Sequence, residues 1–187
     1  MGPGPASDNR GGTMQDLDDP PAPDQNGEAE LHLLCGRIAA GKSTLAKSLV
    51  KRHRAILIGE DDYLEQLYGD KIQSFADYRG HSQRLRQLIT PLCIDLLQRG
   101  INIVLDFPAN TPSCRQWLKN IIQQSEARHT LHYLTTPVER CREQLQQRIV
   151  KQQKNSSPIA LNEFDEINRY FVPPDVTEGF NVEIVRA

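Results

Sequence analysis

Gly36, Gly41, Lys42 and Ser43 occur at the spacing G-x-x-x-x-G-K-[ST] within the segment GRIAAGKST. Glycines allow a loop to turn its backbone N–H groups inward, because side chains at those positions would block the approach of a phosphate. The ammonium group of Lys42 can reach β- and γ-phosphates, and the hydroxyl of Ser43 can coordinate Mg²⁺. The spacing therefore predicts a loop that binds a nucleoside triphosphate.

The context of this loop supports the prediction. The apolar segment LHLLC precedes it, and a helix predicted from Ser43 would add the positive end of its dipole. The alternative is an ordinary glycine-containing turn, which the strand before the loop and the helix after it disfavour. We expect all but one residue of the loop to contact the nucleotide: Gly36, Arg37, Ala39, Ala40, Gly41, Lys42, Ser43 and Thr44.

Acidic residues follow two of the predicted strands. Glu60, Asp61 and Asp62 come after the second strand, where negative charge beside a polyphosphate is unfavourable unless it serves the chemistry. One carboxylate could accept the proton of an attacking hydroxyl group, and another could orient water on Mg²⁺. Asp106 ends the segment INIVLD and is a second candidate for binding near the metal. The alternatives are helix caps after the second strand and an ordinary turn residue at Asp106.

Arginine side chains precede the polar stretch KQQKNSSP. A guanidinium group over the phosphates would neutralise charge in the transition state of phosphoryl transfer. Arg140 and Arg148 are eight residues apart and share a stripe of the predicted helix, whereas Arg142 points elsewhere. We expect Arg148, at the edge of a mobile lid near residues 149–160, to reach the nucleotide. The alternative is a solvated surface arginine.

The elements that must position these residues alternate along the chain. Short segments rich in Val, Ile and Leu predict five strands, and amphipathic segments between them predict helices. The strands are predicted at 31–35, 55–58, 101–106, 130–134 and 181–185. The helices are predicted at 43–53, over a long segment that Pro91 could kink and that Gly100 ends, from Pro112, from Pro137, and at 162–170. This order predicts an α/β chain with a five-stranded parallel sheet and helices on both faces. Ligands bind beyond the carboxyl ends of such strands, where the loop and both acidic segments lie.

Composition sets limits on the chain outside the site. Residues 1–30 hold five prolines, five glycines and seven acidic residues, which predicts a disordered tail before a domain at 31–187. The remaining residues include 21 basic and 17 acidic side chains. This mild excess suits a polyphosphate but not the dense basic patch of a nucleic-acid binder, so nucleic acid is the less favoured partner.

The cysteines and the apolar runs concern location. Four cysteines without a CxxC pair predict reduced thiols and no cysteine-based zinc site. No apolar run reaches the roughly 18 residues that a membrane-spanning helix needs, so we expect no membrane association and a cytoplasmic location.

GRIAAGKST, GEDDYL, LDFPANT and the arginine-bearing helix together resemble the P-loop small-kinase group. This group includes zeta toxins, chloramphenicol phosphotransferase, gluconate kinase and the kinase domain of polynucleotide 5′-hydroxyl kinase, and the chain also resembles bacterial ATP-binding proteins of the AAA family. The resemblance covers about residues 31–185. It implies the P-loop NTPase fold with an adenylate-kinase-like sheet, Mg-ATP as phosphate donor, and an aspartate after the second strand as base.

The resemblance also assigns residues. It implies Asp61 as the base, with Asp62 second, and it implies that the segment before the last strand borders the adenine, in particular Pro174, Gly179 and Phe180. Polynucleotide kinases carry an arginine three residues after the base, where this chain has Leu64. That difference disfavours a nucleic-acid 5′ end as substrate.

The sequence predicts a kinase that transfers the γ-phosphate to a hydroxyl group of a small molecule such as a metabolite, antibiotic or nucleotide sugar. The side chains expected to line the acceptor pocket are Asp62, Tyr63, Tyr78, Arg79 and Arg84, with His81 nearby as a more ordinary surface histidine. The alternatives are a toxin-like or RNA-end kinase and a non-catalytic ATP-binding switch. A switch needs no base, so Asp61 distinguishes these alternatives. The sequence predicts no oligomeric state.

Overall fold

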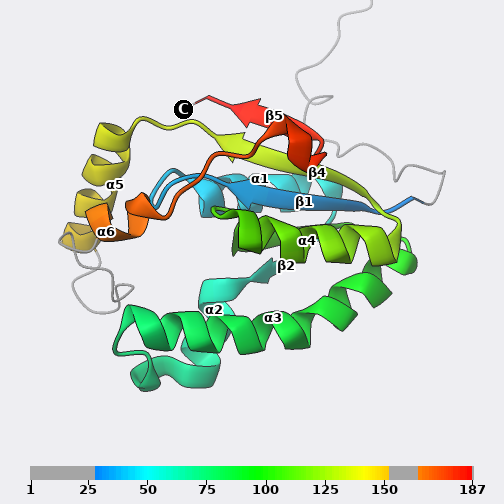
Figure 1. Cartoon of the computed structure of the whole chain (residues 1–187), viewed down its shortest axis with the longest axis horizontal. Helices are drawn as coiled ribbons and strands as arrows, with labels where there is room; N and C mark the ends of the chain where they lie inside the picture. Colours follow the sequence, from blue (N-terminus) through cyan, green and yellow to red (C-terminus); the bar gives the residue numbers. More distant parts are fainter. Residues whose placement is uncertain (1–27, 152–163, 187) are drawn as a thin grey trace, which may run out of the picture.

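The five strands form one parallel sheet, and the central strand leads into the glycine-rich loop (Figure 1). The computed structural model describes residues 28–151 and 164–186. The strand order is β2-β3-β1-β4-β5, with β1 at Glu30–Cys35, β2 at Ile56–Gly59, β3 at Ile103–Pro108, β4 at Arg128–Leu134 and β5 at Val182–Val185. The predicted α/β fold class with a five-stranded parallel sheet is confirmed. The first strand begins at Glu30 and Ala29 is already buried, so the folded part starts slightly before Leu31.

Helices connect the strands, as expected for parallel neighbours. They are α1 (Lys42–His53), α2 (Glu60–Tyr68), α3 (Phe75–Gln98), α4 (Pro112–Ser125), α5 (Val138–Lys151) and α6 (Phe164–Arg169), with short 3₁₀ turns η1 (Gly69–Lys71) and η3 (Val176–Glu178). Pro91 lies inside α3 without ending it, and Pro112 occupies the first turn of α4. The predicted tail falls mostly at 1–27 and most of the predicted lid at 152–163, both outside the described residues.

The two faces of the sheet are buried under different helices. Leu31, Leu33 and Cys35 alternate along β1 and belong to the cluster that contains buried residues of α3 and α4. Leu34, between them, belongs to the cluster with Ala46 of α1. Helices therefore cover both faces, as predicted, and the strands present their carboxyl ends at a common edge.

The register of the sheet fixes which residues meet at that edge. Gly59 at the end of β2 pairs with Asp106 of β3, and the N–H of Ala109 donates to the carbonyl oxygen of Leu34 at 3.0 Å. The segments that follow β1, β2 and β3 therefore emerge side by side. Among the described helices, none combines the length and apolar character required to cross a membrane.

Candidate active site

Two glycines shape the glycine-rich loop for different reasons. Gly41 has a φ of 102° at the residue before α1, in the left-handed region that disfavours side chains. At Gly36, an added Cβ would lie 3.1 Å from the Cβ of Leu134 and 3.2 Å from its carbonyl oxygen. The first glycine is thus required by close packing against β4, and the second by backbone conformation.

Lys42 is folded across this loop. Its Nζ donates hydrogen bonds to the carbonyl oxygens of Gly36 at 2.7 Å and Arg37 at 2.8 Å. Burial lowers the pKa of Lys42, and the negative charges of Asp106 and Asp61 oppose that shift. The charges of Lys42, Asp61 and Asp106, which come from three separate segments, therefore act on one another.

Two polar side chains that the sequence analysis did not select hold the loop in place. The backbone N–H of Gly36 donates to Oδ1 of Asn110 at 3.0 Å, and the hydroxyl of Thr136 donates to the carbonyl oxygen of Ala40 at 2.9 Å. Asn110 lies in the segment LDFPANT, whose position after a strand was the available signal. Thr136 follows β4 and belongs to no local motif, so only the fold reveals its role.

Among the acidic residues after β2, Glu60 has a structural role. Its side chain is buried and accepts hydrogen bonds from the hydroxyls of Tyr78, at 2.6 Å, and Ser82. A nitrogen of Arg86 lies 3.6 Å from the same carboxylate. All three partners belong to α3, so Glu60 joins the start of α2 to this helix.

Asp61, the next residue, interacts electrostatically with Lys42 of the loop. Desolvation of its carboxyl group, followed by repulsion from Glu60 and Asp106, raises the pKa of Asp61, while Lys42 acts in the opposite direction. An aspartate with a raised pKa is better suited to accept a proton than an ordinary one. The side chain is nevertheless exposed enough to meet a substrate.

The residues expected to line an acceptor pocket lie on α2 and α3. Asp62 and Tyr63 are exposed on α2, and Arg79 and Arg84 are exposed on α3. Tyr78 was expected to line the same pocket, but its hydroxyl donates a hydrogen bond to the buried Glu60 carboxylate. The ring of His81 stacks on Tyr68 with centroids 3.9 Å apart.

Arg142 and Arg148 of α5 have different surroundings. Arg142 pairs with Asp165 of α6 at 2.5 Å. Arg148 is exposed near the end of α5, and Cys141 and Leu145 of the same helix pack against Ala39 and Ala40 of the loop. The helix that carries Arg148 therefore lies against the glycine-rich loop.

The expectation that Gly179 and Phe180 contact the nucleotide is wrong. Phe180 packs edge-on against His129, with ring centroids 5.7 Å apart, and His129 pairs with Leu31 at the amino end of the sheet. His129 and Leu134 are five residues apart along β4, which corresponds to about 16 Å. Gly179 and Phe180 therefore lie near the opposite edge from the glycine-rich loop, whose Gly36 packs on Leu134.

The start of the same segment does reach the loop. The guanidinium carbon of Arg37 lies 4.7 Å from the centroid of the Phe171 ring, and the N–H of Val172 donates to the carbonyl oxygen of Asn110. The chain then runs back along the sheet towards β5 (Figure 1). Because β5 is parallel to its neighbour, this segment must start at the loop edge and end at the opposite one.

Arg115 holds this returning segment. The residue is fully buried on α4 and donates to the carboxylate oxygens of Glu178 at 2.6 and 2.7 Å. It also donates to the carbonyl oxygens of Ala109, Val172 and Pro173. The sequence analysis missed Arg115, because an arginine in a helical pattern is ordinarily a surface residue.

Comparisons with known proteins agree with this architecture. The chain matches the sequence profile of AAA_33, described as an AAA domain, over residues 31–174. Similar solved structures include a protein from Chloroflexus aurantiacus proposed to be a kinase, which is 18% identical with a TM-score of 0.67 over 85% of each chain. None of the curated proteins matches the sequence.

Two further solved structures contain nucleotide analogues. The Mycobacterium tuberculosis APS kinase CysC in complex with AMPPNP and APS is 16% identical with a TM-score of 0.59, covering 85% of this chain and 88% of that one. Chaetomium thermophilum Kti12 in complex with ADP-AlF3 is 14% identical with a TM-score of 0.63, covering 83% and 88%. Identities this low establish a common fold alone.

Proposed function

The chain belongs to the AAA_33 family of AAA domains, and on that basis we propose that it is an ATP- and Mg²⁺-dependent kinase. In this proposal the γ-phosphate is transferred to a hydroxyl group of a small molecule. The fold is one that P-loop kinases share, and the APS kinase of M. tuberculosis has been solved with both a nucleotide analogue and the small molecule APS. These similarities support phosphate transfer as the class of reaction, and the site residues support a hydroxyl group as the acceptor.

The convergence of Lys42, Asp61 and Asp106 carries the proposal. A loop that only bound ATP would need Lys42 and a carboxylate for the metal ion such as Asp106. It would not need Asp61, a further carboxylate with a raised pKa whose charge also acts on Lys42. Glu60 is committed to Tyr78 and Ser82 of α3. Asp61 therefore remains as the residue that can accept a proton from an acceptor hydroxyl.

The glycine-rich loop fits a triphosphate. Gly36 packs closely on Leu134 and Gly41 adopts a left-handed conformation, which together shape the loop, and the Lys42 ammonium group already binds oxygen atoms of the loop. Phosphate oxygens would compete with these carbonyl oxygens for the same ammonium group. The residues from Gly36 to Thr44 except Ile38 are thus proposed to bind the nucleotide, with Arg148 approaching from α5.

Ser43 and Asp106 are the residues proposed to hold Mg²⁺, since both offer oxygen atoms and Asp106 lies close enough to act on the pKa of Lys42. When bound, Mg-ATP supplies the phosphoryl group and a cation that neutralises its charge. The chain contributes the remaining functions. Asp61 takes the hydroxyl proton, Lys42 binds phosphate oxygens, and the exposed side chains of α2 and α3 orient the acceptor.

Asp61→Asn tests the proposal most directly. We expect it to lower γ-phosphate transfer by 10²–10⁴-fold while ATP still binds, because the amide cannot act as a base. The assay uses γ-labelled ATP with panels of metabolites, antibiotics, nucleotide sugars and RNA ends. Glu65→Gln is the matched control, since it makes the same kind of change at an exposed position of the same helix that is assigned no role in the site.

The same variants separate the alternatives. Transfer to an RNA end, or growth arrest on expression that Asp61→Asn relieves, would indicate the RNA-end or toxin-like kinase. ATP-dependent partner binding that persists in Asp61→Asn, without transfer to any acceptor, would indicate the switch. Unchanged ATP affinity and turnover in Lys42→Ala would overturn the nucleotide site itself.

A further inference from the structure

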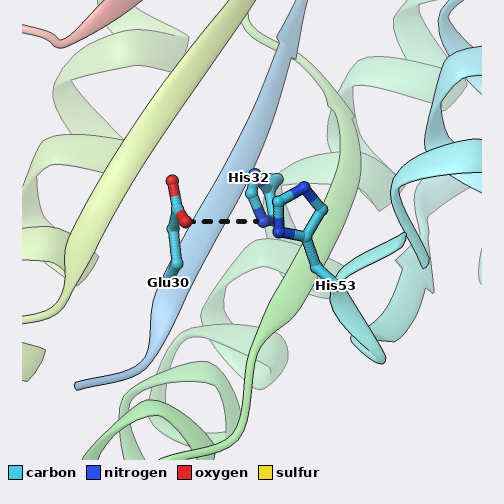
Figure 2. Close-up of side chains that lie close together, drawn as sticks. All are labelled: Glu30, His32 and His53. Carbon is cyan, nitrogen blue, oxygen red and sulfur yellow. Dashed lines mark ion pairs between the residues drawn. The ribbon is translucent and has the colours of Figure 1, made fainter. Parts of the chain in front are cut away.

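A cluster of histidines lies on the α1 side of the sheet, away from the glycine-rich loop. His32 of β1 has the same side-chain direction as Leu34, which packs with α1. His53, the last residue of α1, brings its ring to 4.1 Å from that of His32, measured between centroids. Glu30 of β1 completes the group, as Figure 2 shows. One potential ligand atom from each of Glu30, His32 and His53 lies within 4.8 Å of the other two.

A chain of hydrogen bonds from Glu183 through His132 orients the ring of His32. The carboxylate of Glu183 lies 2.9 Å from Nδ1 of His132 and can only accept, so this nitrogen carries the proton. In a neutral imidazole ring that carries its proton on Nδ1, Nε2 is the acceptor. The Nδ1 of His32, 3.2 Å from that Nε2, is then the donor. His32 therefore presents Nε2 as a bare lone pair.

That lone pair has no hydrogen-bond partner although it is buried. The His32 side chain is 2% exposed, and its Nε2 has no partner among the residues that the structure describes. Oε2 of Glu30 lies 3.9 Å from this nitrogen and is also an acceptor when the carboxylate is charged. Two acceptors face each other across a distance too long for a shared proton, and this arrangement is unfavourable unless a cation lies between them.

A metal ion matches this spacing. Zinc binds histidine nitrogens and carboxylate oxygens at about 2.0–2.2 Å in a tetrahedral arrangement, which sets two ligand atoms about 3.4 Å apart, so the 3.9 Å between His32 and Glu30 needs only a small movement of the side chains. A histidine ligand that donates its other N–H to a carboxylate-linked partner is the usual arrangement around bound metals. Here the chain from Glu183 through His132 to His32 provides that support.

We propose that Glu30, His32 and His53 form a site for a borderline divalent transition metal such as Zn²⁺, with two nitrogen ligands, one oxygen ligand and an open fourth position. The ion would tie the end of α1 to the start of β1. This site is independent of the proposed kinase activity, because it lies at the amino end of the sheet and shares no residue with the glycine-rich loop.

The test is metal binding by the full-length protein after chelator treatment, without nucleotide. We expect one Zn²⁺ per chain by equilibrium dialysis and a higher melting temperature with Zn²⁺ than without it. His53→Gln and Glu30→Gln should each weaken binding at least 100-fold. Glu183→Gln, which removes the carboxylate at the start of that chain of hydrogen bonds, should weaken it about tenfold. His81→Gln, a histidine outside the cluster, should bind Zn²⁺ like the original chain.

Co²⁺ gives a second readout that does not depend on stability. We expect its visible spectrum to show nitrogen and oxygen ligation without a thiolate charge-transfer band, and His53→Gln should abolish that spectrum. Circular dichroism checks that the variants are folded. The proposal is overturned if the original chain binds no stoichiometric Zn²⁺, if both ligand variants bind it normally, or if the Co²⁺ spectrum indicates cysteine ligands.

Discussion

Arg115 and Glu178 are 63 residues apart in sequence, and their side chains form a two-pronged ion pair at 2.6 and 2.7 Å inside the protein. The guanidinium group is fully buried, and the Glu178 side chain is 23% exposed. Because Arg115 also donates to three carbonyl oxygens, it fastens the segment that returns from the glycine-rich loop to β5. One buried charge thus organises a stretch that has no strand and only one short turn of helix.

Glu178→Gln should destabilise the protein by about 3 kcal/mol. Removing one partner of a buried ion pair leaves the other charge uncompensated, and the three carbonyl contacts of Arg115 keep the loss at the lower end of the usual range. The free energy of unfolding in urea measures this effect. Arg99→Gln is the control, since the Arg99–Asp95 pair is exposed on both sides and should contribute little to stability.

The same pair predicts a dependence on acid. Hydrogen bonds from Arg115 lower the pKa of Glu178 below its ordinary value of 4.5. The unfolded chain therefore takes up this proton first, so the contribution is complete above pH 4.5 and is lost as the pH falls below it. Glu178→Gln should show a shallower loss of stability over that acid range. Equal slopes for the two proteins would mean that the ion pair is not formed in solution.

Glu60→Gln should weaken folding and leave catalysis largely intact. The carboxylate accepts from Tyr78 and Ser82 and faces Arg86, so an amide would present a donor to groups that already donate. We expect a loss of about 1.5–3 kcal/mol in the free energy of unfolding. Asp62→Asn, at an exposed position, should change it by less than about 0.5 kcal/mol. Loss of phosphate transfer with unchanged stability would instead assign Glu60 to the chemistry.

The contrast between Glu60 and Asp61 illustrates what the sequence could predict. The glycine-rich loop, the alternation of strands and helices along the chain, and the acidic segment are local patterns. They could therefore be predicted from residue types and spacing alone. Which carboxylate points into α3 depends on Tyr78 and Ser82, 18 and 22 residues further along. Only the packed helix pair decides that orientation.

Longer separations account for the remaining differences. Phe180 was assigned to the nucleotide because it precedes the last strand, but a parallel strand begins at the edge opposite the loop. His32 and His132 are 100 residues apart and carry no recognisable spacing. Their meeting follows from the register of β1 with β4, in which His32 pairs with Thr130 and Leu34 with His132.

Cys93 should make the protein sensitive to alkali. Burial raises the pKa of this thiol from its ordinary 9.0 to about 12. The unfolded chain releases the proton first, so stability is complete below pH 9 and falls between pH 9 and 12, by about 1.4 kcal/mol per pH unit for this group. Urea denaturation at pH 8 and pH 10.5 measures the slope. Cys93→Ala should be less stable at pH 8 but should lose less between the two values, and a parallel loss in both proteins would contradict the assignment.

Asn110→Ala should impair nucleotide binding beyond its effect on stability. The side chain accepts the N–H of Gly36 at 3.0 Å, so its removal leaves a partly buried donor unpaired at the first residue of the loop. We expect a loss of about 1–2 kcal/mol in the free energy of unfolding and a roughly tenfold weaker affinity for ATP. Isothermal titration with ATP and Mg²⁺ measures the second effect.

Asn102→Ala provides the matched control for that experiment. Asn102 accepts the N–H of Glu30 at 2.9 Å, so it performs the same task for β1 at the amino end of the strand. Its replacement should cost at least as much stability, because the N–H of Glu30 and the carbonyl oxygen of His53 both lose a partner. ATP affinity should stay unchanged, since the loop lies at the other end of β1. Equal losses of affinity in both variants would mean that general destabilisation, rather than the shape of the loop, governs nucleotide binding.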